Sequence, residues 1–260
     1  MASSPFSFEN RDGHKLSGVL ERPIGRARAF ALFAHCFTCS KSSLASYRIS
    51  QALAEKGIGV LRFDFTGLGE SEGDFGVGLT GDVHDIVSAA CAMEKADVPV
   101  QLLIGHSFGG AAVLAAAASI KSVEAVAVIG APYHADHVLK HVGNASGEIR
   151  RDGRTPVTIG GRPFALGAEF LAAIRNHDQE ACIAQLGRAL LVLHSPIDAV
   201  VSVENASEIF RAARHPKSFI SLDDADHFLL KQQDADYAAS VIEAWSSRYI
   251  DIDIAPAAHR

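Results

Sequence analysis

The sequence predicts an α/β fold in which a mostly parallel sheet is flanked by helices. Three observations lead to this prediction. Short β-rich segments alternate with longer segments of helical periodicity along most of the chain. Apolar runs such as Val123–Ile129 are typical of strands that are buried on both faces of a sheet. A strand followed by a helix, repeated several times, indicates parallel strands joined by right-handed crossovers.

The expected elements can be placed in order along the chain. Strands are predicted at residues 15–23, 27–35, 57–65, 98–105, 123–132, 188–195 and 216–227. Helices are predicted at residues 42–56, 80–95, 109–120 and 203–213, and from Asp234 onward. In the first helix Ser42 or Ser43 can cap the start, and Gly57 marks the end.

The alternation of strands and helices is interrupted between about Tyr133 and Leu186. This segment contains a helical piece, a basic turn, a hairpin-like stretch (TPVTIGGRPFAL) and a second helix at residues 167–177. We interpret it as a lid insertion that covers one end of the sheet. The whole chain, residues 1–260, is then expected to be a single domain.

Composition excludes several classes of protein. The formal net charge of −6 over 260 residues, with no long basic run, gives no support for nucleic-acid binding. The longest apolar runs, such as Ala111–Ser119, are too short for a membrane span, which needs ~20 residues. The N-terminus lacks the basic and apolar regions of a signal peptide. Four cysteines do not suggest a disulfide framework, so a cytoplasmic location is expected.

The motif Gly-His-Ser-Phe-Gly-Gly stands between the strand that ends near Ile104 and the helix that begins near Gly109. Ser107 therefore lies on a tight strand-to-helix turn. Gly105 and Gly109 flank it because side chains there would clash. The free amides and dipole of a helix N-terminus favour developing negative charge. This context predicts a nucleophilic serine, although a plain glycine-rich turn is the alternative.

A nucleophilic serine needs a histidine base and a carboxylate that orients the base. Asp198 follows the sixth predicted strand, and His227 follows the seventh. The carboxyl ends of parallel strands form one edge of a sheet, so these residues should meet near Ser107. The order serine, acid, histidine is the one expected of this chemistry on an α/β sheet. We therefore predict a Ser107–His227–Asp198 triad.

Other residues compete for these roles. Among the twelve histidines, His35 and His106 are expected to shape loops. Four more lie in the insertion, and His194 precedes the acid loop. Asp223, Asp224 and Asp226 are too close to His227 in sequence to reach it from another strand end, so they are interpreted as solvated loop carboxylates.

The oxyanion of an acyl-transfer intermediate needs two backbone N–H donors. One is expected from Phe108, the residue after the nucleophile. The other is expected from Phe37, in the loop HCFTCSK that follows the second predicted strand. No metal or cofactor is required for this chemistry.

The segments FAHCFTCSK, RFDFTGLGESEGDF, GHSFGGAAVLAAA and RPF carry a family resemblance. Through them the chain resembles the α/β-hydrolase superfamily over nearly its whole length. They are most similar to the hydrolase domain that is fused to an OsmC-like peroxide-reductase domain in bacterial proteins. The resemblance implies an α/β-hydrolase fold and hydrolysis of small, short-chain carboxylic esters. It also implies the triad and oxyanion positions given above, and an OsmC-like partner domain in relatives.

Two departures from the family pattern stand out. Most members have His-Gly before the oxyanion donor, whereas this chain has His35 and Cys36, which puts the Phe37 assignment in doubt. No OsmC-like sequence follows the hydrolase segment.

Four other features of the sequence have an ordinary structural interpretation: a cysteine pair, a glycine-rich segment, an arginine cluster and three apolar residues. Cys36 and Cys39 form a C-x-x-C spacing that favours packing of a tight loop over redox or metal chemistry. GLGESEG lacks the Lys-Ser/Thr of a phosphate loop and is interpreted as a turn. The basic cluster of the insertion is expected to be a solvated tip, and it comprises Arg150, Arg151 and Arg154. Three apolar residues can line an acyl pocket or pack on the sheet, namely Phe164, Leu166 and Phe170.

The sequence leaves alternatives open. The same triad supports thioesterase, lactonase, amidase or perhydrolase activity. A scaffold or binding module that keeps the fold without turnover is the alternative from another class. The natural substrate stays undetermined, and so does the oligomeric state, including whether the chain forms a homo-oligomer.

Overall fold

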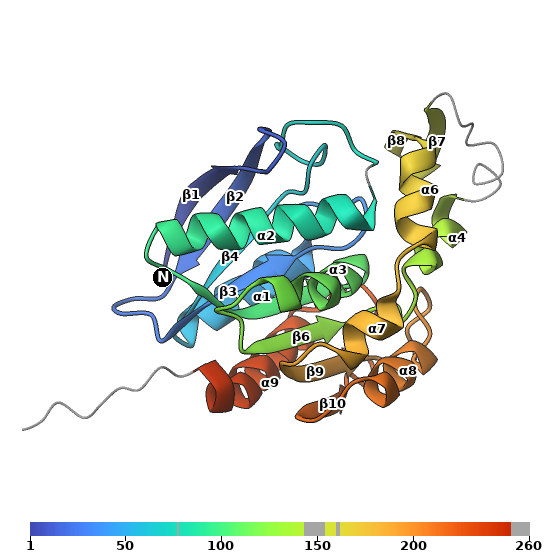
Figure 1. Ribbon diagram of the computed structural model, residues 1–260. Coiled ribbons are helices and arrows are strands. Elements are labelled where there is room, and N and C mark those ends of the chain that lie inside the picture. The colour runs from blue at the N-terminus through green and yellow to red at the C-terminus, as the bar shows by residue number, and fades with distance from the viewer. Residues whose placement is uncertain (77, 143–153, 160–161, 251–260) are drawn as a thin grey trace, which may run out of the picture.

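The computed structural model describes residues 1–76, 78–142, 154–159 and 162–250 of the chain. Within these residues an eight-stranded sheet has the order β1-β2-β4-β3-β5-β6-β9-β10 (Figure 1). The strands are β1 (Ala2–Glu9), β2 (Lys15–Arg22), β3 (Ala29–Ala34), β4 (Ile58–Phe63), β5 (Val100–His106), β6 (Ala125–Ile129), β9 (Ala189–His194) and β10 (Lys217–Ser221). The pairs β1–β2 and β2–β4 are antiparallel, and every pairing from β4 to β10 is parallel. The predicted mostly parallel sheet is therefore confirmed.

Helices cover both faces of the sheet and create two hydrophobic cores. One face carries α1 (Leu44–Glu55) and α9 (Gln232–Ile250). The other face carries α2 (Leu79–Lys95), α3 (Phe108–Ala116) with the short η1 (Ala117–Ser119), α7 (Gln179–Ala184) and α8 (Glu204–Ala212). Since both faces are covered, all residues of β4, β6 and β9 are buried, which explains their apolar sequences.

The strand β1 and the helix α7 were not predicted from the sequence. β1 (sequence ASSPFSFE) lies at the edge of the sheet and is largely exposed, so its serines and proline carry no apolar pattern. The helix α7 has only six residues, too few for periodicity to show. Its start is capped by Asp178, whose side chain accepts a hydrogen bond from the amide of Ala181 at 2.9 Å.

The described residues between 133 and 186 form a set of small elements, most of which lie beyond the end of the sheet where α2 begins (Figure 1). Besides α7, they include η2 (Ala135–Val138), α4 (Leu139–Val142), the hairpin β7 (Thr155–Ile159) and β8 (Arg162–Leu166), and α6 (Ala168–Arg175). The predicted hairpin and the helix after it are present. Arg150 and Arg151 lie outside the described residues.

Arg154 was expected to be solvated at the tip of a turn. It is exposed in the structure, and its side chain also makes two contacts that the sequence did not predict. Its guanidinium forms an ion pair with Asp74 at 2.9 Å and donates a hydrogen bond to the carbonyl of Phe75 at 2.6 Å. Arg154 therefore ties the hairpin to the loop that follows β4. Sequence periodicity cannot reveal such a contact, because the two segments lie about eighty residues apart.

The turn between β5 and α3 is the closest approach of a strand and a helix in the site region. A Cβ atom on Gly105 would lie 2.4 Å from the carbonyl oxygen of Gly109. A Cβ on Gly109 would lie 2.4 Å from the carbonyl oxygens of Ala34 and His35. These obstacles are backbone atoms, which cannot move aside as a flexible side chain can. Glycine is therefore required at both positions.

We expect Gly109→Ala to destabilise the protein by roughly 2 kcal/mol or more, as overpacking against backbone does. The sign of the change in stability distinguishes the two cases, because alanine in place of glycine at an open helical position would stabilise the protein by about 1 kcal/mol. Urea denaturation followed by circular dichroism measures the change. A variant as stable as the parent would contradict the close packing of α3 against β3.

Candidate active site

Ser107 lies between β5 and α3 with an uncommon backbone conformation, φ 54° and ψ −123°. A positive φ is unfavourable for residues other than glycine and costs about 1–2 kcal/mol. Two backbone hydrogen bonds hold the turn: Ser107 N–H donates to the carbonyl of Ile129 at 2.8 Å, and Gly110 N–H donates to the carbonyl of Ser107 at 2.8 Å. The side chain is thereby presented at the carboxyl edge of the sheet, as the sequence predicted.

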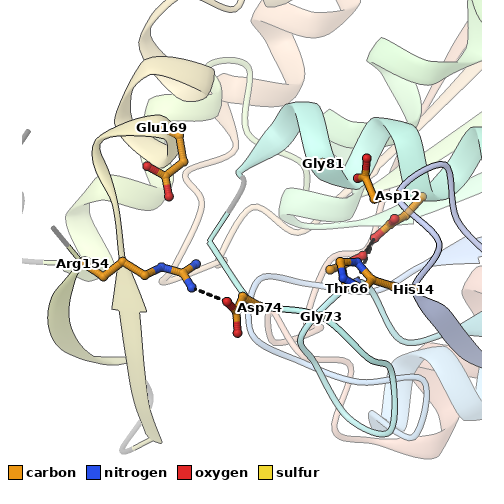
Figure 2. Close-up of a pocket in the computed structure, with 9 residues that line it drawn as sticks. Asp12, His14, Thr66, Gly73, Asp74, Gly81, Arg154 and Glu169 are labelled. Atoms are coloured by element: carbon orange, nitrogen blue, oxygen red, sulfur yellow. Dashed lines mark hydrogen bonds and ion pairs between the residues drawn. The ribbon is translucent and has the colours of Figure 1, made fainter. Parts of the chain in front are cut away.

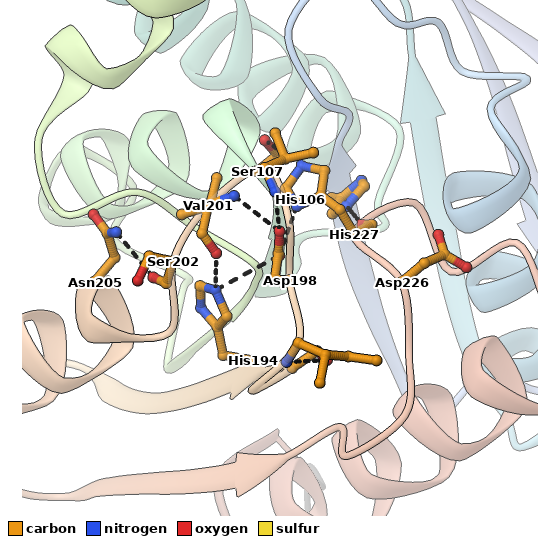
Figure 3. Close-up of polar contacts among 12 residues, drawn as sticks. His106, Ser107, His194, Asp198, Val201, Ser202, Asn205, Asp226 and His227 are labelled. Atoms are coloured by element: carbon orange, nitrogen blue, oxygen red, sulfur yellow. Dashed lines mark hydrogen bonds and ion pairs between the residues drawn. The ribbon is translucent and has the colours of Figure 1, made fainter.

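The structure brings Asp198 and His227 to the same place (Figure 3). Asp198 stands in the loop after β9, and His227 stands in the loop after β10. The Nε2 atom of His227 is 3.0 Å from Ser107 Oγ, and its Nδ1 atom is 2.7 Å from Asp198 Oδ2. Both distances permit hydrogen bonds. Three residues from three separate loops therefore form one connected chain of polar contacts.

The carboxylate of Asp198 is held in its charged form. Burial alone would raise its pKa, but hydrogen bonds from His227 and from the amides of Val201 and Val200 outweigh burial and lower the pKa. Both amides donate to Oδ1 at 2.8 Å, which leaves Oδ2 for the imidazole. The charge of Asp198 is thus fixed, and so is the direction in which it faces His227.

Two further histidines support this arrangement. His106 donates from Nε2 to the backbone carbonyl of His227 at 2.7 Å, and burial together with the nearby His227 lowers the pKa of His106 to about 3. His194 donates from Nε2 to the carbonyl of Val201 at 2.8 Å, and burial lowers its pKa. Both rings are therefore neutral and hold the loops that carry His227 and Asp198. The sequence predicted a loop-shaping role for His106 but gave no signal for His194.

The competing carboxylates take no part in these contacts. Asp223 and Asp224 are exposed in the loop after β10, as expected. Asp226 accepts hydrogen bonds from the amides of Phe228 at 2.8 Å and Leu230 at 3.1 Å, which closes the turn beyond His227. Its role is local to that turn.

The loop after β3 carries Phe37 next to Phe108. The ring centroids of these two residues are 5.3 Å apart, so the two predicted donor residues are neighbours in space. The amide of Phe108 begins α3, and the first amides of a helix have no partner inside the helix. Among the described residues, Phe37 N–H has no backbone acceptor either. Cys36 and Cys39 of this loop are joined by a disulfide, whereas the sequence favoured two unbonded packing residues.

A small cavity lies beside this loop. Four phenylalanines line it together with the acidic residues at the start of α2, and its volume is about 20 Å³, room for about one water molecule. The four are Phe37, Phe75, Phe108 and Phe170. Phe164 packs on Phe75 at 4.6 Å, and Leu166 is fully buried, so neither of these predicted lining residues borders the cavity.

The sequence did not predict that carboxyl groups would line this cavity. Burial, with the neighbouring charge of Asp85, raises the pKa of Asp82 well above its ordinary value. Burial also raises the pKa of Asp85, although hydrogen bonds from Thr66 and Asn10 oppose it. The cavity wall therefore carries a carboxyl group whose pKa is raised by burial and by a neighbouring carboxylate. Along the sequence these residues look like the polar side of an ordinary helix.

A larger, open cavity of about 660 Å³ adjoins the small one and shares part of its lining (Figure 2). Its lining comprises Asp12, His14, Thr66, Gly73, Asp74, Gly81, Asp85, Arg154 and Glu169. Figure 2 shows Arg154 reaching from the hairpin side toward Asp74, so the residue that ties the insertion to the body also borders this cavity.

Two further features are absent from the part of the chain that the structure describes. The described residues contain no candidate metal site and no candidate membrane span. They hold no group of three or more His, Cys, Asp or Glu side chains arranged to bind a metal ion. None of their helices combines the length and the hydropathy that crossing a membrane requires.

Comparison with known proteins now identifies the family. The profile of the Alpha/beta hydrolase family matches residues 31–240. The chain belongs to this family. The match runs from β3 to α9 and includes Ser107, Asp198 and His227.

Individual relatives agree with the family assignment. The esterase domain of a Rhodothermus marinus protein is 42% identical, with a TM-score of 0.80, and the match covers 96% of this chain and all of that one. The ferulic-acid complex of Est1E from Butyrivibrio proteoclasticus is 16% identical, with a TM-score of 0.78 over 94% of this chain and 99% of that one, which shows the fold alone. The uncharacterized protein YfhR of Salmonella typhimurium is 26% identical over 95% of this chain and 77% of its own length.

The buried histidines predict how stability depends on pH. Burial lowers the pKa of His35 to about 4 and that of His106 to about 3, from an ordinary value of 6.5. Below pH 6.5 these two histidines bind protons in the unfolded chain but stay neutral in the native state. The free energy of unfolding therefore falls as the pH falls toward their native pKa values. Each group contributes up to about 1.4 kcal/mol per pH unit.

We therefore expect His106→Gln to have a shallower loss of stability between pH 6.5 and 4 than the parent. Urea denaturation at several pH values measures the slope. The matched control is His134→Gln, because His134 is exposed. Equal slopes for the parent and His106→Gln would show that His106 is protonated in the native state.

Proposed function

We propose that the protein is a serine carboxylesterase that hydrolyses small, short-chain acyl esters through an acyl-enzyme. The observation that carries the proposal is the chain of contacts from Ser107 Oγ to His227 Nε2 at 3.0 Å and from His227 Nδ1 to Asp198 at 2.7 Å. A hydroxyl, a base and an orienting carboxylate in this order are what nucleophilic acyl transfer needs. The esterase domain from Rhodothermus marinus, 42% identical, supports ester hydrolysis.

The proposed mechanism follows from the positions of these groups. His227 Nε2 takes the proton of Ser107 while Oγ attacks the ester carbonyl. Asp198 keeps the proton on Nδ1 and stabilises the imidazolium that forms. His227 then gives its proton to the leaving alcohol. Water enters, His227 serves again as base, and the acid leaves Ser107.

The amides of Phe37 and Phe108 are the proposed oxyanion donors. Phe108 is favoured because its N–H begins a helix beside the nucleophile, where the helix dipole adds to the attraction. Phe37 is favoured because its ring packs on Phe108 and its N–H has no backbone acceptor in the described part of the chain. Each such donor contributes about 3 kcal/mol to transition-state stabilisation.

The small aromatic cavity supports a short acyl chain. Its walls include both proposed oxyanion residues, so we propose it as the space that receives the acyl group. About 20 Å³ accommodates only a small group without displacement of the phenylalanine rings. The larger cavity that adjoins it offers a path from solvent. We propose Phe170, which lines the cavity and packs on Phe37, as the residue that limits chain length. Phe164 packs on Phe75, another residue of the cavity wall.

Ser107→Ala should lower kcat for p-nitrophenyl acetate by about a thousandfold or more, because the nucleophile is lost while the fold is kept. The same variant should not be labelled by a fluorophosphonate probe. Ser119→Ala is the matched control, because Ser119 is exposed in η1. Activity within about tenfold of the parent would refute the serine assignment.

The same experiment separates the alternatives. A parent protein that neither turns over esters nor reacts with the probe would favour the scaffold interpretation. A parent protein that reacts with the probe but prefers thioesters, lactones, amides or hydrogen peroxide as co-substrate would keep the triad and change the reaction. Parallel assays with these substrates distinguish the two outcomes.

Phe170→Leu should shift the preference toward longer acyl chains. The smaller side chain enlarges the cavity, and one added methylene in an apolar pocket changes selectivity by about tenfold or more. Leucine is chosen because Phe170 is fully buried and truncation to alanine would cost roughly 3–5 kcal/mol of stability. The ratio of kcat/KM for p-nitrophenyl hexanoate and acetate measures the shift. Phe219→Leu, at an exposed position, is the control. An unchanged ratio would mean that the acyl chain binds elsewhere.

A further inference from the structure

The disulfide between Cys36 and Cys39 brackets Phe37, one of the two proposed oxyanion residues. The bond spans three positions in sequence and closes a turn in which Cys39 N–H donates to the carbonyl of Cys36 at 3.0 Å. The turn also contains Thr38 at φ 58°, a conformation that a β-branched residue seldom adopts. A covalent bond therefore holds the very turn that presents the Phe37 amide.

The two ends of this loop are anchored without the disulfide. On one side, His35 Nδ1 lies 2.9 Å from the carbonyl oxygen of Cys36, directly after β3. On the other side, Lys41 N–H donates to Asp64 Oδ1 at 2.7 Å, and Arg62 donates to the carbonyl of Lys41 at 2.8 Å. Opening the disulfide would therefore free residues 37–39 while the rest of the loop stays in place.

The two sulfur-bearing residues differ in their access to solvent. Cys36 is only 4% exposed, whereas Cys39 is partly exposed. Disulfides open when a thiolate attacks one of the two sulfurs, so access decides which sulfur is attacked. A small reductant in solution reaches Cys39, and Cys36 is then the leaving group.

We propose that Cys36–Cys39 is a redox-active site, opened by a small dithiol, that controls esterase activity through the position of the Phe37 amide. A thiolate of the dithiol attacks Cys39 Sγ, the S–S bond breaks, and Cys36 leaves as a thiolate that takes up a proton. The second thiolate of the dithiol then attacks the dithiol sulfur that is bonded to Cys39. Cys39 leaves as a thiolate and is protonated in turn. The dithiol becomes a disulfide, and its two electrons and two protons reside on the cysteines.

The effect falls on catalysis and leaves the fold largely unchanged. The stabilisation that a disulfide gives through chain entropy grows with the length of the closed loop, and here the loop is very short. An oxyanion donor, in contrast, acts only when it is held within hydrogen-bond distance of the developing charge. Release of Thr38 from its left-handed conformation would turn the Phe37 amide away. The inference rests on the proposed esterase function.

The test uses the whole wild-type chain. Thiol titration of the oxidised protein should find Cys91 and Cys182 free, and treatment with dithiothreitol should make all four cysteines titratable. After the reductant is removed by gel filtration under nitrogen, kcat for p-nitrophenyl acetate should be lower by about tenfold or more, with KM changed by less than about threefold. Reoxidation should restore kcat.

Two double variants serve as controls. Cys36→Ser/Cys39→Ser should have the low activity of the reduced protein and should not respond to dithiothreitol. Cys91→Ser/Cys182→Ser removes the free cysteines and should respond as the parent does. Circular dichroism shows whether each variant is folded, and the wild-type titration decides the matter if the first variant is not.

The outcomes distinguish this inference from the function on which it rests. If all four cysteines become titratable after reduction and kcat does not change, the redox inference is wrong and the proposed esterase function is unaffected. The same holds if Cys91→Ser/Cys182→Ser loses the response. Oxidised protein without Ser107-dependent activity overturns the proposed function, and the redox inference falls with it.

Discussion

Ser107 can reach His227 because no side chain separates β5 from α3. A Cβ on Gly105 or Gly109 would meet backbone atoms at 2.4 Å, so the strand and the helix pack as closely as their main chains permit. The turn between them must then be sharp, and Ser107 adopts φ 54° as the consequence. The turn is buried, and the amide and the carbonyl of Ser107 are hydrogen-bonded to β6 and α3 respectively. The geometry of Ser107, the proposed nucleophile, is thus set by packing in the core.

The buried charge of Asp198 positions His227 in the proposed triad. Asp198 is ionised because two amides and an imidazole donate to it. The histidines around it stay neutral because burial disfavours their charged forms, and each uses its Nε2 proton to hold a loop carbonyl. If His106 or His194 were charged, it would compete with His227 for the field of Asp198. Keeping them neutral leaves the hydrogen bond of His227 to Asp198 without a competing charged imidazole.

The sequence predicted those parts of the site that depend on chain order and on the period of apolar residues. Ser107 and Asp198 follow the buried strands β5 and β9, and His227 follows the edge strand β10. The carboxyl ends of parallel strands meet at one edge of a sheet, so the convergence of the three residues could be expected. Contacts between distant polar segments could not, because nothing in local sequence encodes them. The ion pair of Arg154 with Asp74 is one such case.

The small cavity is a second case. Two of its phenylalanines lie in loops, one after β3 and one before α2, and the other two lie in the helices α3 and α6. Only the folded chain shows that they meet. The edge strand β1 was missed for a different reason, since a strand exposed to solvent lacks the apolar pattern that marks a buried one.

The two proposed oxyanion donors are held by different physical means. Phe108 belongs to a helix whose start is fixed by the core, so its amide has no freedom to move without unpacking α3 from β5. Phe37 belongs to a loop whose ends are fixed by buried polar contacts, including the ion pair of Lys41 with Asp64. Between those ends the conformation depends on the disulfide and on aromatic contacts with Phe108 and Phe170. Of the two proposed donors, Phe37 is therefore the one whose position can change without separating a helix from the sheet.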